Sequence, residues 1–182
     1  MGASERFLIK PDPTDIRLTE KVGGTDQDGK ELITSVTVER PLTLFLNSQE
    51  IVTMMSICDY PEFLAVGYLV NQNMLKDNDE ILSVEYEEDI ETVIVRTNKK
   101  TNYENKLRKK TLTSGCAQGT VFGDLMEKFE SVSLSPDIKL KTSDLYAVLK
   151  SINMVPSLYL EAGAIHGCVL CKGSIPILFM ED

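Results

Sequence analysis

The sequence predicts an α/β domain in which paired strands alternate with helices. Two observations support this prediction. Apolar residues alternate along several short stretches, as in half-buried strands, and in other stretches they recur at helical spacing. A chain of 182 residues forms one domain of ordinary size, and a hydrophobic content of 42% is enough for a core.

The first half of the predicted domain is a hairpin, a helix and a second hairpin. Alternating apolar residues place strands at 34–46 and 51–55. Asp59 and Glu62 have the spacing of a capping box, so the apolar run after them is expected to form a helix. A second hairpin is expected over 81–97, around an acidic turn.

The second half is predicted to hold a basic loop, two helices and a last hairpin. The polar segment 98–112 is expected to be exposed, either as solvated surface or as an anion-binding loop. Helical spacing predicts a helix at about 120–130, and Thr142-Ser143-Asp144 is expected to cap the next helix. The apolar runs 165–171 and 175–180 read as paired strands.

The two ends of the chain differ in character. Residues 1–32 are polar, contain several prolines and glycines and show no sustained period, so a mobile N-terminal arm is expected there. Residues 33–182 are then the folded domain. No later element covers Ile175, Ile177 and Phe179 of the last apolar strand, so the domain is expected to be incomplete at its C-terminus.

Composition excludes several classes of partner. The net charge of −9 argues against nucleic acid, because phosphate binding needs a basic face. No apolar stretch approaches the roughly 20 residues of a membrane span, and the N-terminus lacks the apolar core of a secretory signal. Four cysteines in a chain this long do not indicate a disulfide framework. We therefore expect a cytoplasmic protein with reduced thiols.

Cys116 is the candidate catalytic residue. It comes directly after Gly115 and precedes the predicted helix at 120–130, so it is expected on the loop that leads into a helix N-terminus. The N–H groups there and the basic residues of 98–112 would lower the pKa of a thiol, and the thiolate is the reactive form. The alternative is a buried structural cysteine. A position between glycines favours the reactive one.

Four residues have the chemistry of a zinc site, but their predicted positions do not fit one. His166, Cys168 and Cys171, with Cys116 as a fourth ligand, have the right elements for zinc. However, Cys168 and Cys171 fall on a predicted strand, where residues three apart point to opposite faces. The zinc-deaminase pattern is also unmet, because Cys168 occupies the position of its glutamate. We expect no bound metal.

His166 is the single histidine of the chain, and its role stays open. It could line a cleft or be a hydrogen-bonded core residue. A Cys116–His166 dyad would make the protein a cysteine hydrolase, provided that the fold brings the two together. Nucleotide-binding glycine motifs are absent from the sequence.

Several segments resemble, in the correct order, the formate dehydrogenase accessory sulfurtransferases of the FdhD type. Residues 41–55 (PLTLFLNSQEIVTMM) are similar to that family's opening hairpin, and 59–75 (DYPEFLAVGYLVNQNML) to its first helix. SGC at 114–116 is similar to the start of its cysteine loop. AGAIHGCVLC at 162–171 is similar to its Thr-Gly-Gly-x-His-Ala-Ala segment, and Met180-Glu181-Asp182 matches the family sequence after that segment.

The resemblance implies a cytidine-deaminase-like mixed sheet with flanking helices, and a sulfur carrier. Such proteins accept sulfur as a cysteine persulfide from a cysteine desulfurase. They pass it to the molybdenum or tungsten bis-pterin guanine dinucleotide cofactor (the molybdopterin guanine dinucleotide form of the molybdenum cofactor), which is destined for a formate dehydrogenase. The carry-over assigns the persulfide to Cys116, with no structural metal. A homodimer is one further expected association.

Three positions depart from the family pattern. Gly119 stands where many members have a second cysteine, so a relay between neighbouring thiols is excluded while a single-cysteine carrier remains sufficient. Ala162 and Ala164 replace the family's Thr and Gly. The family also continues beyond the Glu-Asp pair. A non-catalytic module that binds the cofactor or acts as a chaperone for the dehydrogenase is the alternative function.

Overall fold

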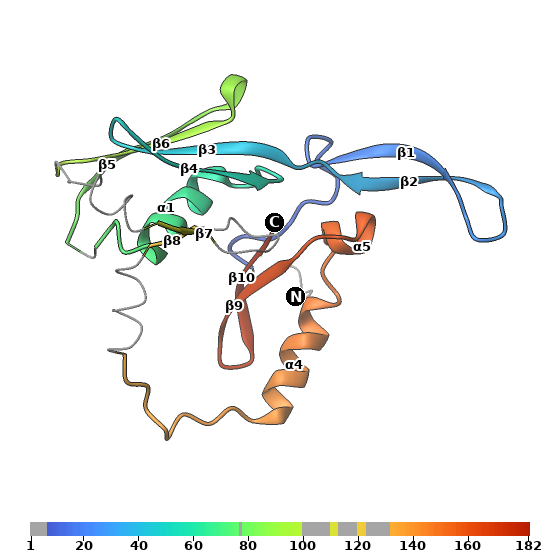
Figure 1. The fold of residues 1–182 in the computed structure, drawn as a ribbon. Coiled ribbons are helices and arrows are strands. Elements are labelled where there is room, and N and C mark those ends of the chain that lie inside the picture. The colour runs from blue at the N-terminus through green and yellow to red at the C-terminus, as the bar shows by residue number, and fades with distance from the viewer. Residues whose placement is uncertain (1–6, 77, 100–109, 113–119, 123–131) are drawn as a thin grey trace. The chain divides into compact units, whose positions relative to one another are not determined.

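The computed structural model describes residues 7–76, 78–99, 110–112, 120–122 and 132–182. The backbone divides into two compact bodies, and Figure 1 labels the helices and strands of both. The central body comprises residues 40–134, and the terminal body comprises residues 1–39 together with 135–182. In the described part of the chain, no helix has both the length and the apolar content needed to cross a membrane.

The central body is built on a mixed four-stranded sheet in the order β4-β3-β6-β5. β3 pairs in parallel with β6, whereas β3 with β4 and β5 with β6 form antiparallel hairpins, the hairpins that the alternating residues predict. A short 3-10 turn, Glu88–Ile90, connects the second hairpin. The bounds of the strands are Arg40–Leu46 for β3, Gln49–Ser56 for β4, Ile81–Glu87 for β5 and Thr92–Thr97 for β6.

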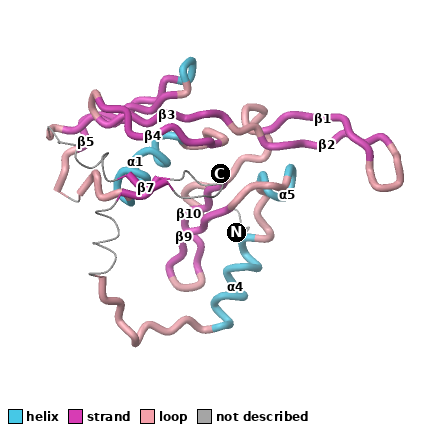
Figure 2. The backbone as a smooth tube through the Cα atoms, in the orientation of Figure 1, coloured by secondary structure: helices cyan, strands magenta, loops and turns pink. Residues whose placement is uncertain are grey.

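Helix α1, Pro61–Asn71, packs on this sheet against β5 and β6 (Figure 2). The strict alternation along β3 buries Leu42, Leu44 and Leu46, each at most 1% exposed. Leu69 of α1 is also completely buried among them. Removal of this apolar area from water is what holds the helix on the sheet.

The terminal body contains two separate hairpins and two helices. β1 pairs with β2, and β9 pairs with β10, both antiparallel. α5 packs against β2 and α4 against β10. The bounds are Thr19–Thr25 for β1, Glu31–Thr37 for β2, Thr142–Ile152 for α4, Leu158–Ala162 for α5, Gly167–Lys172 for β9 and Ile175–Glu181 for β10.

The β1–β2 hairpin corrects the sequence prediction for residues 1–32. No strand was expected there, yet β1 lies wholly inside this segment, and the predicted boundary after residue 32 falls within β2. Most of β1 is exposed on both faces, so it carries no apolar alternation that a sequence pattern could detect. Whether residues 1–32 are mobile stays a prediction.

Glu161 of α5 makes side-chain contacts to both strands of the β1–β2 hairpin. Its carboxylate accepts a hydrogen bond from Ser35 Oγ at 2.9 Å and another from Lys21 Nζ at 3.2 Å. These two bonds lower the pKa of Glu161. A side chain far along the sequence therefore contacts both strands of the hairpin.

Helices α1 and α4 begin where the sequence predicts, but neither is capped as predicted. The N-cap of α1 is Tyr60, in a left-handed conformation with φ 53° and no side-chain capping bond, and Pro61 is the first helical residue. The N-cap of α4 is Lys141, which also makes no side-chain cap. The apolar face of α4 is less buried than expected, with Leu145 43% and Leu149 45% exposed.

Candidate functional site

Cys116 lies in the sequence between two short paired strands of the central body. β7, Lys110–Leu112, pairs antiparallel with β8, Thr120–Phe122, and Leu112 faces Thr120 across the ladder. The residues from 113 to 119, with Cys116 at their midpoint, are therefore the connection between two hydrogen-bonded strands. Cys116 itself is outside the described residues, so its environment stays a prediction.

The strand β8 corrects the prediction of a helix that starts at about residue 120. Thr120–Phe122 is extended, and 123–131 lie outside the described residues. A helix that starts at residue 120 is thus ruled out, while the predicted support of a Cys116 thiolate by a helix N-terminus stays untested. The expected loop 98–112 likewise ends in a strand, since β7 begins at Lys110.

Lys99 is the basic residue of that segment whose side chain is described. It forms an ion pair and hydrogen bond with Asp79, and this contact is the main cause of the lowered pKa of Asp79. The positive charge of Lys99 is therefore paired with Asp79, a residue of the same body. Residues 100–109 lie outside the described part of the chain, so an anion-binding role for them stays a prediction.

Cys58 is a second cysteine with an unusual setting. It sits between β4 and α1 with a positive φ of 59°, and it is only 9% exposed. Its backbone N–H donates to Ser56 Oγ at 2.9 Å. Burial raises the pKa of the Cys58 thiol above its ordinary value of 9.0, and the negative charge of Glu91 raises it further. A thiol in this state is a weak nucleophile.

Tyr86 and Glu91 complete the surroundings of Cys58. The Tyr86 hydroxyl donates a short hydrogen bond to Glu91, whose other carboxylate oxygen lies 3.5 Å from a guanidinium nitrogen of Arg40. Burial, together with the bond to Glu91, raises the pKa of Tyr86. Burial of Cys58 and the carboxylate of Glu91 keep its thiol protonated near neutral pH, so the cluster works against a thiolate.

Cys58 should therefore resist alkylation in the folded protein. At pH 7.5 we expect iodoacetamide to label Cys58 at least about tenfold more slowly than the exposed Cys168, because only an accessible thiolate reacts. Mass spectrometry of the peptides at timed intervals gives both rates in one sample. Addition of denaturant should make the two rates similar. Equal rates in the folded protein would contradict the buried, protonated state.

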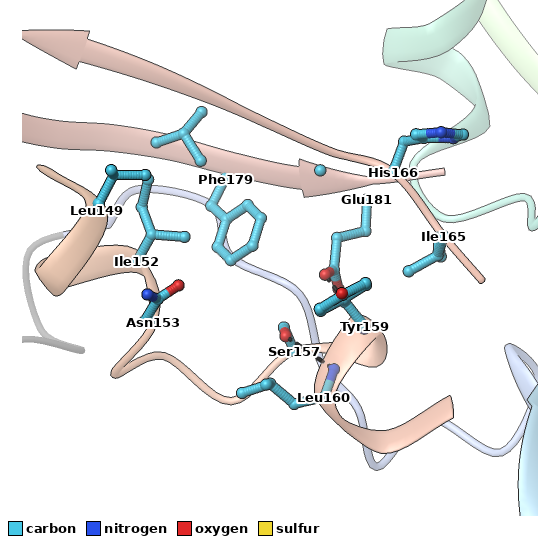
Figure 3. Close-up of a pocket in the computed structure, with 12 residues that line it drawn as sticks. Leu149, Ile152, Asn153, Ser157, Tyr159, Leu160, Ile165, His166, Phe179 and Glu181 are labelled. Atoms are coloured by element: carbon cyan, nitrogen blue, oxygen red, sulfur yellow. Dashed lines mark hydrogen bonds between the residues drawn. The ribbon is translucent and has the colours of Figure 1, made fainter. Parts of the chain in front are cut away.

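A cavity lined by apolar and polar residues lies in the terminal body, between α4, α5 and the β9–β10 hairpin (Figure 3). Its volume is about 380 Å³. The walls are mainly apolar, and four polar side chains contribute to them. These polar residues are Asn153, Ser157, His166 and Glu181.

Glu181 is the buried acid of this pocket. The residue is 3% exposed, and its carboxylate accepts bonds from Leu158 N at 2.7 Å and from Tyr159 N at 3.3 Å. These N–H groups belong to the first residues of α5, which have no partner within the helix. Ser157, also buried, caps the same helix by accepting from Leu160 N. The side chains of Glu181 and Ser157 thus each bond to the start of α5, which forms one wall of the pocket.

His166 lies at the edge of the pocket, immediately before β9. Its backbone exchanges two hydrogen bonds with Asp182, and the residue is exposed. Figure 3 shows its imidazole pointing away from the side chain of Glu181. Of the two roles that the sequence left open, the structure favours the residue that lines a cleft over the core residue. Because Cys116 is not described, no distance joins it to His166, and the dyad stays untested.

Cys168 and Cys171 both lie on β9, as the apolar run predicts. Cys168 faces Met180 and Cys171 faces Pro176 across the ladder, and their separation by three residues places them on opposite faces of the strand. Within the described residues, no three His, Cys, Asp or Glu side chains come together as a metal-binding group. The absence of a metal remains a prediction.

Sequence reasoning missed Glu181 and the Cys58–Tyr86–Glu91 cluster as sites. Glu181 bonds to residues 22 and 23 positions earlier, and no periodic pattern connects such distant positions. Pro156-Ser157 before an apolar turn was a usable signal, because serine is a favoured N-cap. Glu91 reads in the sequence as the first residue of a strand after an acidic turn, and pairing of β5 with β6 brings it to Tyr86.

The chain is similar to several known proteins. The model of the FdhD/NarQ family matches residues 37–182. The sulfur carrier protein FdhD of Listeria monocytogenes serotype 4b (strain F2365) is 25% identical over 148 residues, which are 80% of this chain and 57% of that protein. The protein of the same name from Wolinella succinogenes is 26% identical over 170 residues, or 91% of this chain and 56% of the relative. The chain thus spans about half the length of the curated relatives it matches.

A solved structure has a similar fold. The crystal structure of a formate dehydrogenase accessory protein from Desulfotalea psychrophila superposes with a TM-score of 0.59 at 18% sequence identity. The match covers 90% of this chain and 60% of that one. This likeness agrees with the mixed α/β architecture that the sequence predicts, while the cytidine-deaminase-like description stays an expectation. Because the family model covers well over half of its residues, the chain belongs to the FdhD/NarQ family.

Proposed function

We propose that this chain carries sulfur in the maturation of a formate dehydrogenase. The observation that supports it most is the match of the FdhD/NarQ family model to residues 37–182, together with relatives named sulfur carrier protein FdhD. The chain is proposed to act in the cytoplasm, as a sulfurtransferase.

Cys116 is the proposed carrier residue. In the first step its thiolate attacks the outer sulfur of a donor persulfide, a new S–S bond forms, and the donor cysteine leaves as a thiolate. In the second step the acceptor supplies the electron pair that attacks the outer sulfur, and Cys116 leaves as a thiolate. Placement between two paired strands is suitable, because a loop held at both ends can present its sulfur to two partners in turn.

The proposed donor is a cysteine desulfurase, and the proposed acceptor is the molybdenum or tungsten bis-pterin guanine dinucleotide cofactor, bound as a substrate. The formate dehydrogenase that receives this cofactor is the third partner. Each of these assignments comes from the family resemblance of SGC at 114–116 and of the segment 162–171. The main competing function is a chaperone that holds the cofactor without handling sulfur.

Alkylation of Cys116 distinguishes a carrier from a chaperone. The test uses the chain with Cys168 and Cys171 replaced by serine, so that Cys116 and the slowly reacting Cys58 remain. Labelled and unlabelled protein are each added to an extract that lacks its own FdhD protein, and formate dehydrogenase activity is measured. We expect the label to abolish activation, since the nucleophile is blocked. Full activation by the labelled protein would favour the chaperone.

A further inference from the structure

The pocket of the terminal body has the size and the lining of a small-molecule site. Its volume of about 380 Å³ falls within the range of about 300–1,000 Å³ that is typical of ligand pockets. Ile152 of α4, Ile165 and Val169 beside and within β9, and Phe179 of β10 supply apolar walls. Burial of a flat apolar ring against these walls would remove its surface from water, which favours binding.

The polar end of the pocket is a buried carboxylate. Glu181 is 3% exposed, and the described residues form no ion pair with it. A carboxylate has about four lone-pair positions, so the two bonds from Leu158 N and Tyr159 N leave capacity for further donors. Figure 3 shows this carboxylate beside Ser157 and Tyr159, at the α5 side of the pocket.

Charge decides which ligand end fits this carboxylate. The two N–H donors compensate part of the charge of this buried carboxylate, and a ligand cation with donors of its own would compensate more of it. An amidinium group has two parallel N–H donors that match the two carboxylate oxygens, in a strong charge-assisted pair. A ligand carboxylate would be repelled at the same place. The polar end therefore discriminates between cations and anions.

We propose that this pocket binds a small organic cation, in which a flat apolar ring carries an amidinium group directed at Glu181. The site goes beyond the sulfur-carrier function and does not depend on Cys116. Its residues all belong to the terminal body, and Cys116 belongs to the segment 113–119 of the central body. Failure of one proposal therefore leaves the other intact.

Three probes with the same ring test the proposal on the full chain. Benzamidine is a cation, benzamide is neutral and benzoate is an anion, and saturation-transfer NMR with titration gives the affinity of each. We expect benzamidine to bind at least about tenfold more tightly than benzamide, because a charge-assisted pair replaces a neutral bond. Benzoate should show no binding. Equal affinities, or binding of benzoate alone, would overturn the proposal.

Two variants locate the binding. Glu181→Gln keeps one acceptor oxygen for Leu158 N and removes the charge, so benzamidine should lose its advantage over benzamide. Val169→Trp places a large side chain in the pocket opposite Phe179, two ladder positions from Glu181, and should abolish binding of benzamidine. Leu170→Trp is the control, since Leu170 is 57% exposed and points to the other face of β9. Unchanged benzamidine binding in Val169→Trp would refute the site even if Glu181→Gln failed to fold.

Discussion

Replacement of Cys116 by alanine is expected to abolish persulfide formation on this chain. After incubation with a cysteine desulfurase and cysteine, the unmodified chain should gain one sulfur atom at Cys116, whereas Cys116→Ala should gain none. The reason is chemical, because no other group in the segment 113–119 is a thiol that can form the new S–S bond. Mass spectrometry of the peptides, without reductant, measures the added mass and its position.

Cys168→Ala is the matched control for this experiment. Cys168 is exposed on β9, so it is the described cysteine most accessible to a donor. If accessibility alone decided which thiol accepts sulfur, Cys168→Ala would lower the total and Cys116→Ala would not. We expect the reverse. Undiminished persulfide in Cys116→Ala, or its location on Cys168 or Cys171, would reject Cys116 as the carrier residue.

Leu69→Ala is expected to destabilise the central body by about 2–5 kcal/mol, the usual cost of truncating a completely buried leucine. Leu69 is 0% exposed and lies in the core between α1 and the sheet, so its loss leaves a cavity that the neighbouring strands cannot easily close. Urea unfolding, monitored by circular dichroism, gives the change in the free energy of unfolding from the midpoint and slope.

Val70→Ala, one residue further along α1, serves as the control. Val70 is 49% exposed, so its truncation should change the free energy of unfolding by less than about 0.5 kcal/mol. Alanine has the higher helix propensity in both cases, and the gain is larger for replacement of the β-branched Val70, which widens the expected difference between the two variants. Equal destabilisation by the two variants would mean that α1 is not packed on the sheet as described.

Local patterns in the sequence were sufficient for most of the central sheet and for its helix. β3 was predictable because Leu42, Leu44 and Leu46 alternate strictly with less buried residues, the period that a sheet with one buried face requires. The position of Pro61 marked the start of α1 for a similarly local reason, since proline suits the first helical turn. The β9–β10 hairpin was predictable from two apolar runs around Gly173.

Contacts between distant residues decided the rest. β1 could not be predicted from local patterns, because its contacts are the pairing with β2 and the bond from Lys21 to Glu161, which lies 140 residues away in the chain. The strand at Thr120–Phe122 overrode a helical spacing because β7 supplied a partner for its backbone.

One candidate site is indicated by the sequence alone, and the others depend on contacts between distant residues. The sequence by itself determined which cysteine is proposed to react, since Cys116 stands out through its position between Gly115 and Gly119 and through the family resemblance. Only the tertiary structure decided that Cys58 is a protonated, buried thiol and that Glu181 faces an apolar pocket. The physical reason is that burial and hydrogen bonding, which set the charge state of a group, come from residues that folding brings together.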